Sequence, residues 1–132
     1  MPNIEHPNAN VVRRFYEAFA RGDIEAARSC FDHDAVWHLP GRSPIAGDHR
    51  GVDAIVRFFW KLKELSGGTF KPELIDVVAN DRHTVALQHA TGTRGNKRLD
   101  VTACQLMRIQ EGKILEVRGH YSDQYALDDF WS

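Results

Sequence analysis

The spacing of the apolar residues changes near the middle of this 132-residue chain, and that change restricts its fold more than any other feature. Up to about residue 65, apolar side chains recur every three or four positions, as on one face of an amphipathic helix. From about residue 70 they alternate with polar side chains, as in half-buried strands. The sequence therefore predicts a first helix that is capped by Asn8 or Asn10 and runs to Arg21, and further helices over 24–31 and 52–65. It predicts strands over 70–79, 84–93, 99–109 and 113–121.

A further short strand, DHDAVWHL at 32–39, separates the second and third predicted helices. The four later strands are joined by the short turns NDRH, RGNK and QEGK, which is typical of an antiparallel meander. Helices followed by strands indicate an α+β fold, here a cone-shaped α+β barrel with three N-terminal helices packed on a curved, mainly antiparallel sheet. We expect one domain over 1–132, a loose arm at 1–8, and a ligand pocket in the cone.

Composition and charge narrow the range of partners. A net charge of −1 offers no basic face for nucleic acid or a membrane surface, and no apolar run is long enough to span a bilayer. The N-terminus lacks the apolar segment of a signal peptide, so we expect a cytoplasmic protein whose Cys30 and Cys104 are free, mostly buried thiols. The seven histidines lack metal-binding spacing and there is no glycine-rich phosphate loop, so we expect neither a metal nor another cofactor.

Three segments make the order of elements more specific: FYEAFARGDIEAARSCFDHDAVWHLPG at 15–41, GVDAIVRFF at 51–59 and RIQEGKILEV at 108–117. Together they resemble the nuclear transport factor 2-like superfamily, and within it the SnoaL-like (polyketide cyclase-like) and ketosteroid isomerase-like branches. The resemblance covers about residues 9–125. It implies the cone-shaped fold and a homodimer formed through the open face of the sheet, in a superfamily that contains both enzymes and non-catalytic binding modules.

The ketosteroid isomerase-like branch implies three catalytic positions that this chain does not retain. An aspartate base would stand where the first strand ends, and this chain has Leu39 there. The tyrosine donor on the first helix aligns with Phe15, beside Tyr16, and the protonated aspartate aligns with Gln105. Because leucine cannot accept a proton, the resemblance argues against isomerisation by that mechanism.

The cyclase-like branch implies an acid/base aspartate near the end of the last strand, with a glutamine and histidines in the pocket. Asp123 and Gln105 match those positions, so we predict Asp123 as the acid or base, assisted by His120 or His89. His120 faces the cone only if the strand bulges at Gly119, and His89 faces either the cone or the dimer side. The alternative for Asp123 is that it caps the segment that follows it.

Alternation along the strands selects the candidate pocket wall. Gln105 is the sole polar side chain in its row, and alternation sets Trp37 and His38 on opposite faces of their strand. The resemblance implies that Trp37 and Leu39 face inward and His38 outward. The predicted substrate-binding residues, from helices and strands together, are Tyr16, Phe19, Trp37, Leu39, Phe58, Phe59, Gln105, Met107 and Tyr121.

The sequence leaves two functions open. The first is a cofactor-free enzyme that carries out cyclisation, isomerisation, dehydration or epoxide opening on an apolar cyclic or polyketide-like molecule. The second is a non-catalytic ligand-binding or dimerisation module of the same fold. If Asp123 and Gln105 point into one cavity, the enzyme is favoured; if Asp123 only caps a turn and side chains fill the cone, the module is favoured.

Overall fold

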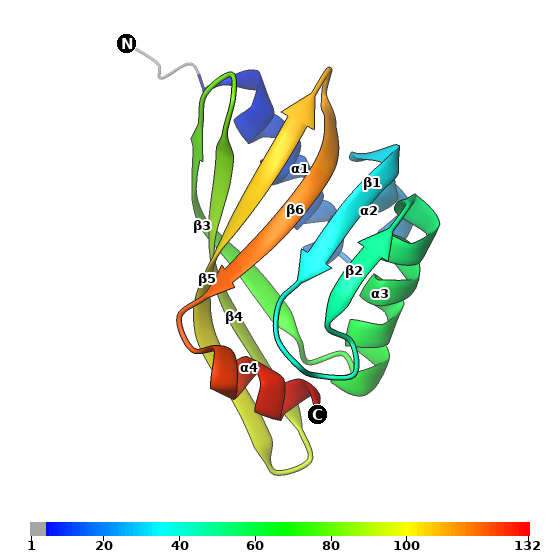
Figure 1. The fold of residues 1–132 in the computed structure, drawn as a ribbon, viewed down its shortest axis with the longest axis vertical. Coiled ribbons are helices and arrows are strands. Elements are labelled where there is room, and N and C mark those ends of the chain that lie inside the picture. Colours follow the sequence, from blue (N-terminus) through cyan, green and yellow to red (C-terminus); the bar gives the residue numbers. More distant parts are fainter. Residues whose placement is uncertain (1–4) are drawn as a thin grey trace.

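A six-stranded sheet with helices packed against it forms the domain (Figure 1). The computed structural model describes residues 5–132, so half of the predicted N-terminal arm, residues 1–4, lies outside the described residues. The helices are α1 (Pro7–Ala20), α2 (Ile24–Arg28), α3 (Val52–Leu65) and α4 (Gln124–Trp131). The strands are β1 (Phe31–Leu39), β2 (Gly47–Arg50), β3 (Lys71–Ala79), β4 (Thr84–Arg94), β5 (Lys97–Gln110) and β6 (Lys113–Tyr121).

The strands lie in the order β2-β1-β6-β5-β4-β3. Strands β3 to β6 form the predicted antiparallel meander, and β1 joins its β6 edge in parallel, with Trp37 beside Val117. In Figure 1, α1 and α2 lie behind the sheet, α3 lies along its β2 side and α4 lies across its lower end. The α+β fold class predicted from the sequence is therefore confirmed.

Two elements were absent from the prediction. Residues 47–50, expected as a polar turn, form the edge strand β2, in which His49 pairs with Trp37 of β1. Residues 124–131, expected as a segment after the last strand, form helix α4, which buries Leu127, Phe130 and Trp131. Both elements are short, and a segment of four or eight residues carries too few periods to be recognised from alternation alone.

Two helix boundaries also differ from the prediction. Helix α1 begins at Pro7, and its N-cap is His6, whose Nδ1 accepts a hydrogen bond from the Asn8 amide at 3.1 Å. The predicted caps, Asn8 and Asn10, therefore lie within the helix. The loose arm is shorter than predicted, because proline is favoured in the first turn of a helix. Helix α2 ends at Arg28 and not at Phe31, which instead begins β1.

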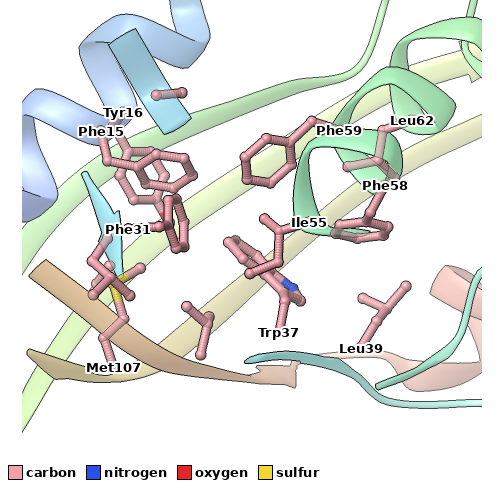
Figure 2. Close-up of a cluster of buried hydrophobic side chains, with 14 of the residues drawn as sticks. Phe15, Tyr16, Phe31, Trp37, Leu39, Ile55, Phe58, Phe59, Leu62 and Met107 are labelled. Carbon is pink, nitrogen blue, oxygen red and sulfur yellow. The ribbon is translucent and has the colours of Figure 1, made fainter. Parts of the chain in front are cut away.

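The core lies between the concave face of the sheet and the helices, and it is rich in aromatic rings (Figure 2). Trp37 of β1 stands at its centre, with its ring centroid 5.5 Å from that of Phe59 and 6.0 Å from that of Phe15. Burial of each such side chain contributes about 1.5–3 kcal/mol to folding. Of the two thiols predicted to be buried, Cys30 is buried and Cys104 is exposed on the opposite face of the sheet.

Within residues 5–132, no helix combines the length and the apolar character needed to cross a bilayer.

Candidate functional site

A small cavity remains at the centre of the cone, enclosed mainly by aromatic side chains. Its volume is about 40 Å³, which is room for roughly three water molecules at most. Every helix except α2 and every strand except β2 contributes to its wall. The lining residues are Phe15, Tyr16, Phe19, Trp37, Leu39, Phe58, Phe59, Leu62, Phe70, Pro72, Gln88, Gln105, Tyr121, Leu127 and Trp131. We call this space the inner cavity.

Two phenol–amide pairs supply most of the polar atoms of the inner cavity. Tyr16 on α1 donates a hydrogen bond of 2.5 Å from its hydroxyl to Oε1 of Gln88 on β4. On the adjoining strands, Nε2 of Gln105 donates to the hydroxyl of Tyr121 at 3.2 Å. Since Gln88 and Gln105 are 3% and 1% exposed, these bonds offset the cost of burying two amides among apolar groups.

Gly119 creates the space in which the second pair forms. It stands opposite Gln105 in the β5–β6 ladder, with Tyr121 two residues further along the same face of β6. A Cβ at position 119 would lie 2.7 Å from Cε1 of Tyr121 and 3.0 Å from Oε1 of Gln105. The missing side chain therefore allows the Tyr121 ring to fold back over the strand and reach Gln105.

Two buried polar atoms of the inner cavity lack a hydrogen-bond partner among the described residues. They are the indole Nε1 of Trp37, which is a donor, and Oε1 of Gln105, which is an acceptor. Both belong to cavity-lining residues that are less than a tenth exposed. Figure 2 shows the Trp37 indole with its nitrogen among the side chains of α3 and β1.

Neither phenol of the inner cavity is suited to act as a base near neutral pH. Burial raises the pKa of Tyr16, and the neighbouring Tyr121 raises it further. Burial likewise raises the pKa of Tyr121, and the hydrogen bond from Gln105 opposes this only in part. The lining, as far as the structure describes the chain, contains no carboxylate, histidine, lysine or cysteine. The inner cavity can therefore donate and accept hydrogen bonds but holds no group that exchanges protons readily at neutral pH.

A larger groove of about 670 Å³ opens between α1 and the start of β3. It shares five lining residues with the inner cavity, so these side chains stand between the two spaces: Tyr16, Phe19, Phe59, Phe70 and Pro72. Phe19 and Phe70 stand at the junction, with ring centroids 6.4 Å apart and ring planes nearly perpendicular. Charged side chains occupy the rim, and one of them is Arg13. Its Nε and Nη2 each donate a hydrogen bond to the carboxylate of Glu5. We call this space the outer groove.

Eight of the nine residues predicted to bind substrate lie in the wall of the inner cavity. They are Tyr16, Phe19, Trp37, Leu39, Phe58, Phe59, Gln105 and Tyr121. Met107, the ninth, faces the same side of the sheet but is 1% exposed within the packed core and does not reach the cavity. That these residues bind a ligand remains a prediction.

The three residues predicted to carry acid/base chemistry lie elsewhere, and this corrects their expected position. Asp123 is exposed and is the N-cap of α4, where its Oδ1 accepts a hydrogen bond from the Ala126 amide at 3.0 Å. His120 is exposed on the convex face of the sheet, because β6 alternates regularly through Gly119. His89 faces the same convex side, with Nε2 2.6 Å from Oδ1 of Asp100.

The His38 side chain faces outward, as expected from the sequence. Its side chain turns away from the core, with Nδ1 2.6 Å from Asp48 on β2 and Nε2 3.3 Å from Glu116 on β6. The hydrogen bond with His38 lowers the pKa of the Asp48 carboxyl below its usual range. This polar cluster ties three neighbouring strands together on the face opposite the inner cavity.

Gln88 is the functional candidate that sequence reasoning missed. The turn RGNK places Arg94 opposite Lys97, and counting back along the two strands sets Ala86 opposite Gln105 and Gln88 opposite Ala103. Because directly paired residues share a face, Gln88 must face inward with Gln105, and His89 must face outward. The hairpin register was therefore the available signal.

Clusters of three or more histidine, cysteine, aspartate or glutamate residues that could hold a metal do not occur within 5–132.

The fold and the cavity define a class: cone-shaped α+β domains that enclose a small, mainly apolar space between helices and a curved sheet. The family model described as "SnoaL-like domain" matches residues 12–117, and the chain belongs to that family. The resemblance predicted from the sequence is thus confirmed.

The chain is similar to proteins of several bacteria. An uncharacterized protein of Mycobacterium tuberculosis is 33% identical over 124 residues, which is 93% of this chain and 95% of that protein. The solved structure of Bal32a, from a soil-derived mobile gene cassette, is 42% identical with a TM-score of 0.92, covering 96% of this chain and 97% of that one. A protein of unknown function with a cystatin-like fold from Xanthomonas campestris is 29% identical with a TM-score of 0.89, covering 95% and 98%.

More distant structures share the fold. An NTF2-like protein from Burkholderia xenovorans is 24% identical with a TM-score of 0.81, and it covers 96% of both chains. A polyketide cyclase-like protein from Xanthomonas campestris is 20% identical with a TM-score of 0.73, covering 96% of this chain and 97% of that one.

Proposed function

We propose that this domain binds a small, largely apolar molecule whose body occupies the outer groove and whose end reaches the inner cavity, and that the end in the inner cavity undergoes no acid/base chemistry. The observation that carries the proposal is the chemistry of the inner cavity: aromatic walls, two phenols and two amides, and no readily titrating group in the described lining. Such a surface recognises a ligand by shape and by a few hydrogen bonds.

The two spaces divide the ligand between them. A volume of about 670 Å³ lies within the range that holds a drug-sized molecule, whereas about 40 Å³ holds only a small group of atoms. The apolar part of the groove wall, which includes Phe19, Phe70 and Leu74, suits a flat or cyclic apolar body.

The alternative of a cyclase, isomerase, dehydratase or epoxide hydrolase requires an acid or base at the reacting atoms. The residues predicted for that part contact the α4 backbone, as Asp123 does, or lie on the convex face of the sheet. The cyclase-like neighbours at 20% identity share a fold that hosts several functions, so they support a small-molecule ligand more than a given reaction.

A groove-filling variant tests the proposal. The probe is 2-naphthol, titrated into the full-length protein and followed by amide chemical shifts. Ala20 is an exposed residue of α1 in the groove wall, so Ala20→Trp fills the groove with little disturbance of the core. Arg14→Trp places the same side chain on the same helix outside the groove and serves as the control.

We expect 2-naphthol to shift groove residues such as Phe70 and Leu74 in the natural protein and in Arg14→Trp. Its affinity should fall at least tenfold in Ala20→Trp, because the indole occupies the volume that the ring needs. Binding that maps to another surface, or that Ala20→Trp leaves unchanged, would show the proposed site to be wrong.

A further inference from the structure

The two unpartnered atoms of the inner cavity define the chemistry of the ligand end that reaches it. Trp37 is 7% exposed and Gln105 is 1% exposed, so water outside the protein does not solvate the Trp37 Nε1 donor or the Gln105 Oε1 acceptor. Buried polar groups in native proteins nearly always have a partner, and leaving one without a partner costs free energy on every folded molecule. Two such atoms in the wall of one small cavity therefore mark a place where a hydrogen-bonding group of a ligand, or water in its absence, is bound.

Ring packing holds the Trp37 side chain in place, and a hydrogen bond holds that of Gln105. The Trp37 ring is packed against the rings of Phe58 and Phe59, at centroid distances of 5.8 and 5.5 Å. The Gln105 amide is held from its other end by the bond from Nε2 to the Tyr121 hydroxyl. The donor and the acceptor are thus fixed before a ligand arrives, which reduces the entropic cost of recognition.

The complementary group must both accept a hydrogen bond and donate one. A carbonyl or ether oxygen satisfies Trp37 but leaves Gln105 without a donor. A carboxylate also lacks a proton to donate, and burying its charge without a cation in the lining is costly. A hydroxyl group has both functions in one atom and fits a cavity of about 40 Å³.

We infer that the ligand carries a hydroxyl group at the end that enters the inner cavity, where it accepts a hydrogen bond from Trp37 Nε1 and donates one to Gln105 Oε1. This inference rests on the proposed function, because it concerns one end of the ligand whose body occupies the outer groove. It makes the ligand an apolar alcohol, enol or phenol.

A pair of probes that differ in a single group tests the inference. In 2-naphthol and 2-methylnaphthalene, a hydroxyl and a methyl group of similar size stand on the same ring system. The affinity of each is measured on the full-length protein and on two variants that remove one partner each. Trp37→Phe keeps an aromatic ring but removes the donor, and Gln105→Met keeps the length of the side chain but removes the acceptor.

The natural protein should prefer 2-naphthol by about ten- to a hundredfold, since each unsatisfied polar group disfavours the methyl compound. The preference should fall at least fivefold in Trp37→Phe and in Gln105→Met, while the affinity for 2-methylnaphthalene stays the same or rises. Trp60→Phe and Gln110→Met make the same substitutions at exposed positions and should keep the full preference.

The two ways of failing are distinct. If neither probe shifts groove residues, the proposed function itself is wrong. If both probes bind the groove with equal affinity, the site exists but does not select a hydroxyl, and the inference is overturned. A preference that persists in both Trp37→Phe and Gln105→Met would also overturn it, because the hydroxyl would then be bound elsewhere.

Discussion

At the scale of single residues, a missing side chain determines what the inner cavity can bind. The Tyr121 ring occupies the space that a Cβ at position 119 would need, and from there its hydroxyl holds one end of the Gln105 amide. The other end of that amide, Oε1, has no hydrogen-bond partner among the described residues. One glycine thus makes room for the ring that holds the Gln105 amide in place.

This arrangement predicts the effect of Gly119→Ala. The added methyl group would clash with Tyr121, displace its ring and break the bond to Gln105, so the free energy of unfolding should fall by about 1–3 kcal/mol. The measurement is urea unfolding, repeated in a Tyr121→Val background in which the clashing ring is gone. In the Tyr121→Val background, Gly119→Ala should lower the free energy of unfolding by less than half as much. An equal loss in both backgrounds would mean that the clash with the Tyr121 ring does not cause the destabilisation.

Residue patterns in the sequence were enough to find most of the cavity wall. Alternation placed Gln105 inward, the family resemblance placed Trp37 inward, and helical spacing placed Tyr16 and Phe59 toward the sheet. The face of β4 could not be assigned in this way, because Val85, Leu87 and His89 look as apolar as Ala86, Gln88 and Ala90. That choice depends on pairing with β5, which alternation within one strand does not contain.

At the scale of elements, α4 closes the wide end of the cone. Leu127 and Trp131 reach the inner cavity from this helix, and the Trp131 ring lies 5.3 Å from that of Phe70. The helix has eight residues, and helices this short are marginal without capping and packing. The sequence left two roles open for Asp123, because an aspartate after a strand can either act as an acid or base at the rim of a pocket or cap the start of a helix.

The capping role gives Asp123 a characteristic response to substitution. Asp123→Ala should lower the free energy of unfolding by about 1 kcal/mol, because the Ala126 amide loses its acceptor. Asp123→Asn keeps an oxygen that can accept this bond and should be nearly neutral. Unfolding is measured by urea titration and binding by the shifts that 2-naphthol induces. Asparagine should leave binding intact, and a loss of binding in Asp123→Asn with normal stability would return Asp123 to the site.

At the scale of the whole molecule, the convex face of the sheet carries an exposed apolar row. Val78, Val85 and Leu106 are successive cross-strand partners there and form an apolar row over three strands. Val78 is 68% exposed in the single chain. A row of this kind, bordered by polar residues, is typical of a surface that another molecule covers.

We expect the purified protein to be a homodimer through this face. Leu106→Asp should convert it to a monomer, because a charge replaces the centre of the apolar row, and sedimentation velocity at micromolar concentration measures the change. Trp60→Asp, on α3 at the other side of the molecule, introduces the same charge at an exposed apolar residue and should leave the dimer intact. A monomeric natural protein would contradict the expectation outright.

The parallel pairing of β1 with β6 has a consequence for biosynthesis. His38 lies beside Arg118, so the strand that carries Trp37 and Leu39 gains its parallel neighbour only when β6 has been made, although its antiparallel neighbour β2 follows it closely in the sequence. Until then, β1 and β2 are not joined to the sheet that β3, β4 and β5 form. Contacts between residues so far apart in the sequence form slowly, and the apolar surface that they bury is meanwhile exposed and prone to aggregation. The binding site is thus complete only after β6 has been made, and a chain that lacks β6 leaves part of its aromatic core uncovered.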